Sequence, residues 1–257
     1  MTSDDKFAGG KGINVSRILQ RLDVDNTATG FIGGFTGRFV ENGLIAEGIK
    51  TNFVQVSEDT RINVKIKAGE ETEINGAGPK ISDEKLEELK AILAGLSSED
   101  TVVFAGSAPS SLGNQVYNTL IPIAKKAGAE VVCDFEGQTL LDSLNYQPLL
   151  VKPNSHELAD IFGVELNGLE DIEKYAREIL AKGAKNVIIS MAGDGALLVT
   201  PEAATLQNQS KALLKILLVL EILWLPDLLV NTLNQVTQSK LLNGVSHVVQ
   251  QRHSQMI

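Results

Sequence analysis

The stretch Phe-Ala-Gly-Gly-Lys-Gly-Ile-Asn-Val-Ser-Arg-Ile-Leu, residues 7–19, decides how the chain is organised. Three glycines in four positions leave no Cβ between the backbone and a ligand, so a polar group can approach the amides closely. From Ile13 onward the apolar residues recur at helical spacing. A glycine-rich turn that opens a helix favours an anion, because the first amides of the helix lack intrahelical partners. The alternative is a tight structural turn without a ligand, and the stretch by itself leaves both interpretations open.

The turn does not have the spacing of the two common nucleotide-binding loops. It lacks the Gly-x-Gly-x-x-Gly pattern of dinucleotide-binding folds, and the chain contains no Gly-x-x-x-x-Gly-Lys-Ser/Thr loop. Lys11 and Asn14 add a cation and an amide that both donates and accepts hydrogen bonds. Lys11 either contacts a phosphate or stays solvated.

The composition excludes several classes of function. With 257 residues, 43% of them hydrophobic, the chain is long enough for one α/β domain, or for one domain and a small lobe. The formal net charge of −9 argues against a nucleic-acid partner and against an anionic membrane surface. The single cysteine, Cys133, fits a reducing cytosol, and the three histidines do not have metal-ligand spacing. We therefore expect a cytoplasmic α/β protein that binds neither nucleic acid nor membranes.

Short apolar runs alternate with helical patterns along most of the chain. Runs such as Thr-Val-Val-Phe-Ala at 101–105 are nearly continuous in apolar residues, which is typical of parallel strands with helices on both faces of the sheet. Three strand-like segments without an intervening helix, at 52–56, 62–66 and 71–74, predict a small separate sheet. We interpret this sheet, about residues 51–75, as a lid.

Small and polar residues follow three of the expected strands. Gly-Ser-Ala-Pro begins at position 106, Lys-Pro-Asn-Ser-His-Glu at position 152, and Ser-Met-Ala-Gly-Asp-Gly at position 190. Parallel sheets bind ligands beyond the carboxyl ends of their strands, so these segments predict one site at a single edge of the sheet. The alternative is three ordinary connections between strands and helices.

The glycine turn and these three segments resemble the ribokinase-like sugar kinases, and the similarity runs from Asp4 to Ala204. The resemblance implies a layered α/β/α fold with a mostly parallel sheet and a small β lid, formed by residues 1–204. It also implies ATP and Mg²⁺ as cofactors, a sugar phosphate as substrate, and a homodimer formed through the lid. The similarity is greatest to the 1-phosphofructokinases, which phosphorylate fructose 1-phosphate. Tagatose-6-phosphate kinases share most of the motifs and remain an alternative.

The resemblance also implies roles for individual residues. On the substrate side it implies contacts with the sugar hydroxyls and the sugar's phosphate, made by Gly9, Gly10, Lys11, Asn14, Arg61 and Ser107. On the nucleotide side it implies contacts with ATP, made by Lys152, Asn154, Glu157, Ser190, Gly193 and Gly195. Asn154 and Glu157 form an Asn-x-x-Glu motif that is expected to organise Mg²⁺ indirectly, through its waters. His156 is expected to be a surface residue of a helix.

Both ends of the chain depart from the family pattern. Family members begin with a strand and a substrate-binding aspartate, whereas eight residues precede Gly9 here. After Ala204 the composition changes, and Gly244 is the only later glycine. A Gly-Ala-Gly-Asp turn, which the resemblance implies should carry the catalytic base and the anion hole, is absent. We therefore expect no catalytic residue and negligible kinase activity. The alternative from a different functional class is a sugar-phosphate-binding protein without catalytic activity, or a misfolded fragment.

A shift of reading frame explains the altered segment after Ala204. Permitted codons for residues 205–227, read from the third base, encode Phe-Ala-Lys-Pro-Ile-Lys-Gly-Leu-Val-Lys-Asn-Ser-Val-Gly-Ala-Gly-Asp-Ser-Met-Val-Ala-Gly, which restores the missing turn. The hypothesis is that residues 205–257 are a non-native tail produced by a frameshift. The alternatives are an amphipathic interaction tail and a membrane anchor. The anchor is disfavoured, because Lys215, Glu221 and Asp227 interrupt the roughly 20 apolar residues that a span requires.

Overall fold

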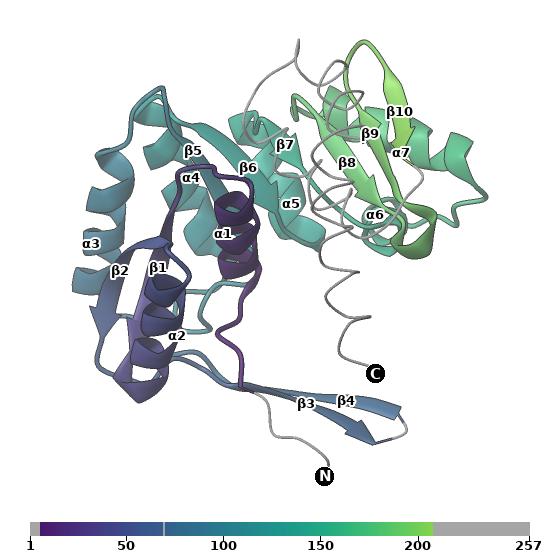
Figure 1. The fold of residues 1–257 in the computed structure, drawn as a ribbon. Helices are drawn as coiled ribbons and strands as arrows, with labels where there is room; N and C mark the ends of the chain where they lie inside the picture. The colour runs from purple at the N-terminus through teal and green to yellow at the C-terminus, as the bar shows by residue number, and fades with distance from the viewer. Residues whose placement is uncertain (1–5, 69, 208–257) are drawn as a thin grey trace. The chain divides into compact units, whose positions relative to one another are not determined.

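The computed structural model describes residues 6–68 and 70–207, and these residues form an α/β unit (Figure 1). Its α-helices are α1 (Lys11–Arg21), α2 (Gly34–Ala46), α3 (Asp83–Ala94), α4 (Tyr117–Lys126), α5 (Gly137–Ser143), α6 (Ser155–Phe162) and α7 (Leu169–Ala181). Its strands are β1 (Thr27–Gly33), β2 (Lys50–Val56), β3 (Asn63–Ala68), β4 (Glu70–Asn75), β5 (Thr101–Ala105), β6 (Glu130–Asp134), β7 (Leu150–Val151), β8 (Val187–Ser190), β9 (Ala196–Val199) and β10 (Ala204–Gln207).

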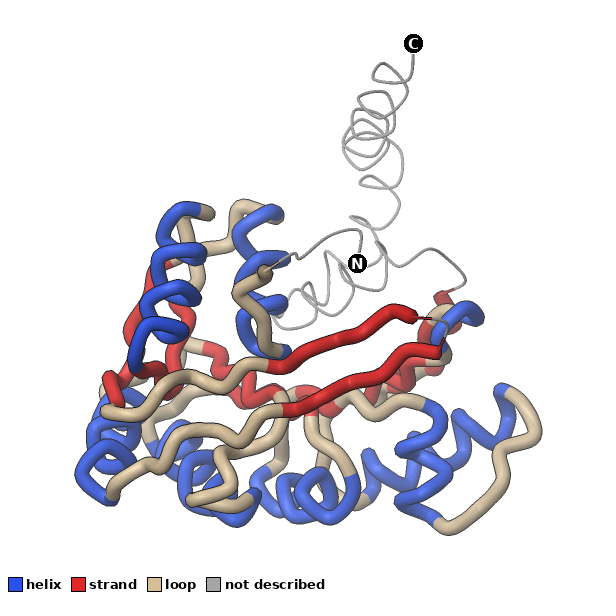
Figure 2. Tube along the Cα trace, turned by 90° about the horizontal axis from the view of Figure 1, so that it is seen from below, coloured by secondary structure: helices blue, strands red, loops and turns tan. Residues whose placement is uncertain are grey.

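The largest sheet has six strands in the order β10-β9-β8-β7-β6-β5. Strands β5 to β8 are parallel, while β9 and β10 are antiparallel to their neighbours. Figure 2 shows a row of helices along one side of the strands and further helices on the other side. The expectation of a layered, mostly parallel sheet, drawn from the continuous apolar runs, is therefore confirmed.

The main hydrophobic core lies between the parallel strands and the helices that connect them. Val131, Val151 and Val187 from three neighbouring strands are fully buried, and Leu140 and Ile179 from α5 and α7 pack in the same cluster. Burying one such side chain contributes about 1.5–3 kcal/mol, so this cluster is the chief source of stability. Because a layer of helices packs on the layer of strands, the ends of the parallel strands are held in fixed positions.

Helix α3 begins directly after a serine whose side chain caps it. The hydroxyl of Ser82 accepts a hydrogen bond from the backbone amide of Lys85 at 3.3 Å, and Asp83 and Glu84 occupy the first turn. The hydroxyl therefore satisfies one of the amides that the helix leaves unpaired, and the two carboxylates complement the helix dipole.

The prediction of one lid sheet over residues 51–75 is wrong for its first strand. Strand β2 pairs with β1 in parallel, from Thr27 opposite Lys50 to Gly33 opposite Val56. A parallel pair needs a crossover connection, and α2 supplies it between the two strands. Of the described strands, only β3 and β4 form a separate hairpin, which Figure 1 shows apart from both other sheets.

Regular structure continues past the expected boundary at Ala204, as far as Gln207. Strand β10 pairs with β9, with Ala204 opposite Val199 and Gln207 opposite Ala196. Ala204 and Leu206 pack against the main core, which explains why the strand persists across the expected boundary. The rest of the expected tail, including a helical pattern at 212–223, lies outside the described residues. Among the residues described, no helix is long and apolar enough to cross a membrane.

Strands β1 and β2 form a two-stranded sheet of their own. It is packed by a second, smaller hydrophobic cluster in which Ala28 of β1 meets Val40 and Leu44 of α2. In the part of the chain that the structure describes, no strand joins β1 to the outer strand of the larger sheet, β5.

Candidate functional site

The glycine turn has the geometry that its sequence predicts. Gly10 lies directly before α1 with a φ of 132°, a backbone conformation that residues with a Cβ rarely adopt. Its carbonyl accepts the first helical hydrogen bond, from the amide of Asn14 at 2.9 Å. Gly9, Gly10, Lys11 and Asn14 are all exposed. The start of α1 therefore presents exposed backbone and two polar side chains to solvent.

Arg61 and Ser107 line one cavity of about 310 Å³, together with Gly12 of the glycine turn. The structure thus brings together three segments that are far apart in the sequence. A Cβ built on Gly12 would meet no atom within 4 Å, so this glycine faces open space. Of the predicted substrate-side residues, Gly9, Gly10, Lys11 and Asn14 lie in the adjoining turn and helix but do not line the cavity.

Arg61 is positioned by the threonine that precedes it. The Thr60 amide donates to the carbonyl of Gly33 at 3.0 Å, and the Thr60 hydroxyl accepts from the Gly33 amide at 3.0 Å. The hydroxyl of Thr36 donates to the Thr60 carbonyl at 2.7 Å. Arg61 itself is exposed, and no described residue forms an ion pair with it. A fixed backbone therefore presents a guanidinium that is available for an anion.

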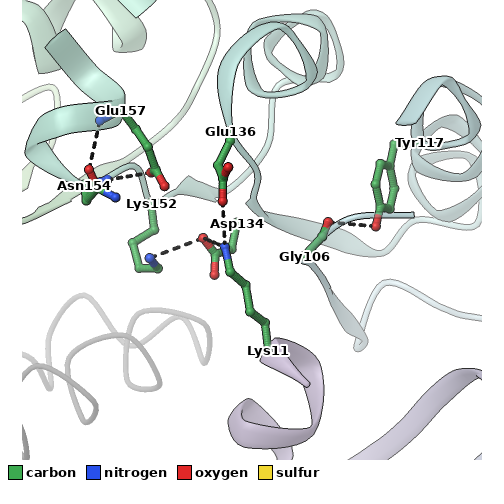
Figure 3. A network of polar contacts seen from close by, with 8 residues as sticks. All are labelled: Lys11, Gly106, Tyr117, Asp134, Glu136, Lys152, Asn154 and Glu157. Carbon is green, nitrogen blue, oxygen red and sulfur yellow. Dashed lines mark hydrogen bonds and ion pairs between the residues drawn. The ribbon is translucent and has the colours of Figure 1, made fainter. Parts of the chain in front are cut away.

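A chain of ion pairs runs from the glycine turn to the end of β7 (Figure 3). The ammonium of Lys11 lies 3.6 Å from Asp134 Oδ1 and 3.5 Å from Glu136 Oε1. The ammonium of Lys152 lies 3.2 Å from the same Asp134 oxygen, and the Asp134 and Lys152 side chains are only 15% and 18% exposed. Two ammonium groups are thus held by two carboxylates at one edge of the sheet.

Asp134 and Glu136 are the site residues that the sequence reasoning missed. Asp134 ends the apolar strand β6, and Glu136 directly precedes α5. The signal that finds Asp134 is the one used for the other strands, a polar residue at the carboxyl end of a buried parallel strand.

Asn154 and Glu157 form a reciprocal cap at the start of α6 (Figure 3). Asn154 Oδ1 accepts a hydrogen bond from the Glu157 amide at 2.8 Å, and Glu157 Oε2 accepts one from the Asn154 amide at 2.8 Å. This arrangement satisfies two backbone donors at once. Both side chains therefore stabilise the helix, and the Asn-x-x-Glu motif has a structural role whatever it binds.

The nucleotide-side residues fall into two groups. Asn154 forms an isolated parallel bridge with Ser190, and the Ser190 amide donates to the Pro153 carbonyl at 3.1 Å, so these residues and Lys152 lie together. Gly193 lines a second, more open cavity of about 1030 Å³, as does His156, which is exposed on α6. Gly195 is buried with a φ of 94° and does not line that cavity.

The described residues do not build a metal cage. They contain no cluster of three or more histidine, cysteine, aspartate or glutamate side chains that could hold a metal ion. One carboxylate oxygen of Glu157, Oε2, accepts the capping hydrogen bond, and the other carboxylate oxygen takes no part in the cap. The donor set fits an indirect role for Asn154 and Glu157, through metal-bound water, and does not fit direct ligation by a complete set of side chains.

Tyr117 supports the turn that carries Ser107. Its hydroxyl donates to the carbonyl of Gly106 at 3.0 Å (Figure 3). Its ring packs on Phe104 and Phe135. Burial raises the pKa of Tyr117 to about 12, so the hydroxyl keeps its proton and stays a donor at neutral pH. Gly106 has a φ of 87°, which makes the turn dependent on glycine.

Comparisons with known proteins identify relatives of this chain. The sequence profile of the pfkB family carbohydrate kinases matches residues 2–212. A 1-phosphofructokinase of Bacillus subtilis is 47% identical over 208 residues, which cover 81% of this chain and 69% of that protein. A D-tagatose-1-phosphate kinase of Bacillus licheniformis is 40% identical over 198 residues, which cover 76% of this chain and 65% of that protein.

A solved structure shares the fold. The phosphofructokinase-2 of Escherichia coli, crystallised with fructose-6-phosphate, superposes with a TM-score of 0.74 at 30% sequence identity. The match covers 79% of this chain and 69% of that one. The chain therefore spans about two thirds of the length of the proteins that it matches.

Proposed function

The chain belongs to the pfkB family of carbohydrate kinases, and on that premise we propose that its described part binds the sugar phosphate and the ATP of a sugar-phosphate kinase. The observation that carries the proposal is the shared cavity of Gly12, Arg61 and Ser107. It combines an arginine, a hydroxyl and exposed helix amides, which are the groups that recognise a phosphorylated sugar. The ion pairs of Lys11 and Lys152 continue from this turn toward the predicted nucleotide side.

Each residue then has a defined task in binding. The Arg61 guanidinium holds the phosphate of the sugar with paired hydrogen bonds, while the Ser107 hydroxyl and the glycine amides bind sugar hydroxyls. Asp134 and Glu136 hold the ammonium groups of Lys11 and Lys152 beside the position where phosphoryl charge develops. Mg²⁺, when bound, neutralises charge on the phosphates of ATP, and Asn154 and Glu157 orient its waters.

We propose fructose 1-phosphate as the sugar and fructose 1,6-bisphosphate as the product of the family reaction. The relatives named 1-phosphofructokinase and D-tagatose-1-phosphate kinase both support a ketohexose phosphate. Tagatose 6-phosphate remains the alternative substrate. Fructose 1-phosphate carries its phosphate at one end of the sugar, and tagatose 6-phosphate carries it at the other end. If Arg61 binds the phosphate, it therefore contacts a different end of the sugar in each case.

We further propose that this 257-residue chain binds without turning over. Its sequence contains no Gly-Ala-Gly-Asp turn, so it lacks the expected base and anion hole. Losing one oxyanion donor typically costs about 10²–10³ in rate, and here the base is lost with the donors. A frameshift near codon 205 accounts for this loss.

Two measurements test these proposals. Base-by-base sequencing of the gene shows whether the codons after Ala204 encode the Gly-Ala-Gly-Asp turn in another frame. Coupled ADP assays then compare this chain with a frame-restored chain on fructose 1-phosphate, tagatose 6-phosphate and D-tagatose 1-phosphate. We expect activity from the restored chain alone, and most of it on fructose 1-phosphate. Turnover by the 257-residue chain contradicts the inactivity, and an inactive restored chain contradicts the assignment as a kinase.

We propose that the hairpin of β3 and β4 joins two copies of the chain. Val64 lies opposite Ile74, and Ile62, Val64, Ile66 and Ile74 are each between 45% and 57% exposed. Alternation places the side chains of Val64, Ile66 and Ile74 on one face of the hairpin, where a second hairpin can cover them. Light scattering should give a dimer mass that Ile74→Lys reduces to that of a monomer. A monomeric unsubstituted chain contradicts this proposal.

A further inference from the structure

The side chain of Arg17, on α1, holds two other segments of the chain beside the glycine turn. Its Nε donates to both carboxylate oxygens of Glu47, at 3.0 Å and 2.7 Å, and its Nη2 donates to Glu47 Oε1 at 2.7 Å. Its Nη1 donates to the backbone carbonyl of Ala8. One guanidinium therefore binds the residue that directly follows α2 and the residue that directly precedes Gly9.

Arg17 and Ala8 are both held firmly. The paired hydrogen bonds fix the plane of the guanidinium, and they lower the pKa of Glu47, so its carboxylate is ionised at neutral pH. Ala8 is 5% exposed and packs in the smaller hydrophobic cluster with Val40 and Leu44 of α2. The Ala8 side chain is thus fixed by packing and its carbonyl by Arg17.

The Ala8 carbonyl and the Gly9 amide belong to one peptide group, which is planar, and the described peptide bonds are all trans. A donor that holds the carbonyl therefore directs the Gly9 amide the opposite way, away from Arg17. That amide donates to no described residue, and Gly9 is exposed. Glycine resists rotation of the peptide group less than any other residue, so the orientation depends on the contact with Arg17. The charged donor also polarises the peptide group and makes its amide a stronger donor.

We propose that Arg17 is a positioning residue for the sugar: it holds the Ala8 carbonyl so that the Gly9 amide is presented to a sugar hydroxyl. Glu47 contributes indirectly, because it fixes the guanidinium. The inference rests on the proposed function, in which the glycine amides bind sugar hydroxyls. Two simpler roles give other results. A structural link between α1 and α2 would change stability and leave sugar affinity unchanged, and a purely electrostatic role would depend only on charge.

Two substitutions separate position from charge, with fructose 1-phosphate affinity measured by isothermal titration. Arg17→Lys keeps the charge, but an ammonium lacks the planar fork that reaches Glu47 and Ala8 together, and we expect affinity about fivefold lower. Glu47→Ala removes a negative charge, so electrostatics alone predicts tighter binding of the anionic sugar. Positioning predicts the opposite sign, with affinity about threefold lower. Unchanged affinity of the folded Arg17→Lys variant, or unchanged or tighter binding by Glu47→Ala, overturns the proposal.

Arg21→Ala is the matched control. Arg21 lies one helical turn later on α1, is exposed, and its side chain makes no hydrogen bond to a described residue. Its removal should leave the affinity for fructose 1-phosphate unchanged. Arg17→Lys should also leave the affinity for ATP unchanged, because Lys152 and Asn154 of the predicted nucleotide side lie on other elements. An equal loss of sugar affinity in Arg21→Ala, or an equal loss of ATP affinity in Arg17→Lys, refutes a specific positioning role.

The orientation of the Gly9 amide is measured without sugar, by two-dimensional ¹⁵N–¹H NMR of the 257-residue chain. Arg17→Lys should shift the Gly9 resonance and leave that of Gly168, before α7, in place. An unshifted Gly9 resonance refutes the positioning role. Absence of titration heat from the unsubstituted chain refutes the proposed function instead, so the two failures are distinguishable. If Arg17→Lys fails to fold, Glu47→Ala decides by the same two measurements.

Discussion

Replacing Asn154 with alanine tests whether the Asn-x-x-Glu motif stabilises the fold as well as serving the nucleotide side. The Asn154 side chain accepts one hydrogen bond of 2.8 Å from the amide of Glu157, and alanine removes it. The reciprocal bond survives, since Glu157 accepts from the Asn154 backbone. Loss of an N-cap side chain costs about 0.5–2 kcal/mol, typically ~1. Helix α6 has only eight residues, so the cap stabilises a large part of it.

Equilibrium urea unfolding, followed by circular dichroism, measures this effect. A loss of about 1 kcal/mol, with a slope of roughly 2 kcal/mol/M, lowers the midpoint by about 0.5 M. Asn154→Asp is the matched control, because aspartate caps helices as well as asparagine and should keep the midpoint within about 0.2 M. The aspartate variant should nevertheless bind ATP more weakly, since it adds a negative charge beside the expected phosphates.

The cap interpretation is refuted if Asn154→Ala unfolds at the midpoint of the unsubstituted chain, or if Asn154→Asp is as unstable as the alanine variant. The nucleotide role is refuted if calorimetry gives the same ATP affinity for the unsubstituted chain and the aspartate variant.

Three other outcomes follow from the structure. Gly12→Ala should stabilise α1 by about 0.5–1 kcal/mol in urea unfolding, because the new Cβ meets no protein atom. The same Cβ takes up space in the cavity that Gly12 lines, so the variant should bind fructose 1-phosphate more weakly. A destabilised variant contradicts this prediction. Burial raises the pKa of Cys133 to about 12, so the thiol should not react with Ellman's reagent at pH 8 until urea unfolds the chain; rapid labelling of the folded chain contradicts it. Burial alone would raise the pKa of Glu130, but hydrogen bonds from Lys185 and Lys125 outweigh it and keep the pKa below 4.5. The resulting stabilisation is complete above pH 4.5 and is lost as the pH falls through the lower folded-state pKa, so Glu130→Gln should flatten the acid side of a plot of urea midpoint against pH.

Most of the fold could be predicted from local patterns. The strand at 101–105 has the bounds of the apolar run that predicts it, because a parallel strand covered by helices on both faces needs apolar residues along its whole length. The cap at Ser82 follows from short-range chemistry that needs no tertiary contact.

The partner of a strand could not be predicted in the same way. Strand β2 has the alternation of an exposed hairpin strand, and its pairing with β1 depends on a crossover through α2 that packing decides. Strand β10 was missed because its apolar residues are few, and only its register against β9 places Leu206 on the core.

The site shows the same division. Arg61 and Ser107 could be placed in one cavity from the positions of their segments and from the family resemblance. Asp134 and Glu136 could not be selected, because a carboxylate after a strand becomes informative only once Lys11 and Lys152 are seen beside it. In the sequence Gly12 cannot be distinguished from Gly9 and Gly10, and only the structure shows that Gly12 is the one that lines the cavity.

Isothermal titration of fructose 1-phosphate into the purified chain tests most directly whether the cavity of Gly12, Arg61 and Ser107 is a sugar-phosphate site. We predict saturable heat from the unsubstituted chain and an affinity at least tenfold lower for Arg61→Ala. Arg38→Ala, which removes an exposed arginine of α2 that does not line the cavity, should leave the affinity unchanged. Absence of heat from the folded unsubstituted chain, or equal affinity of the Arg61→Ala variant, would contradict the assignment.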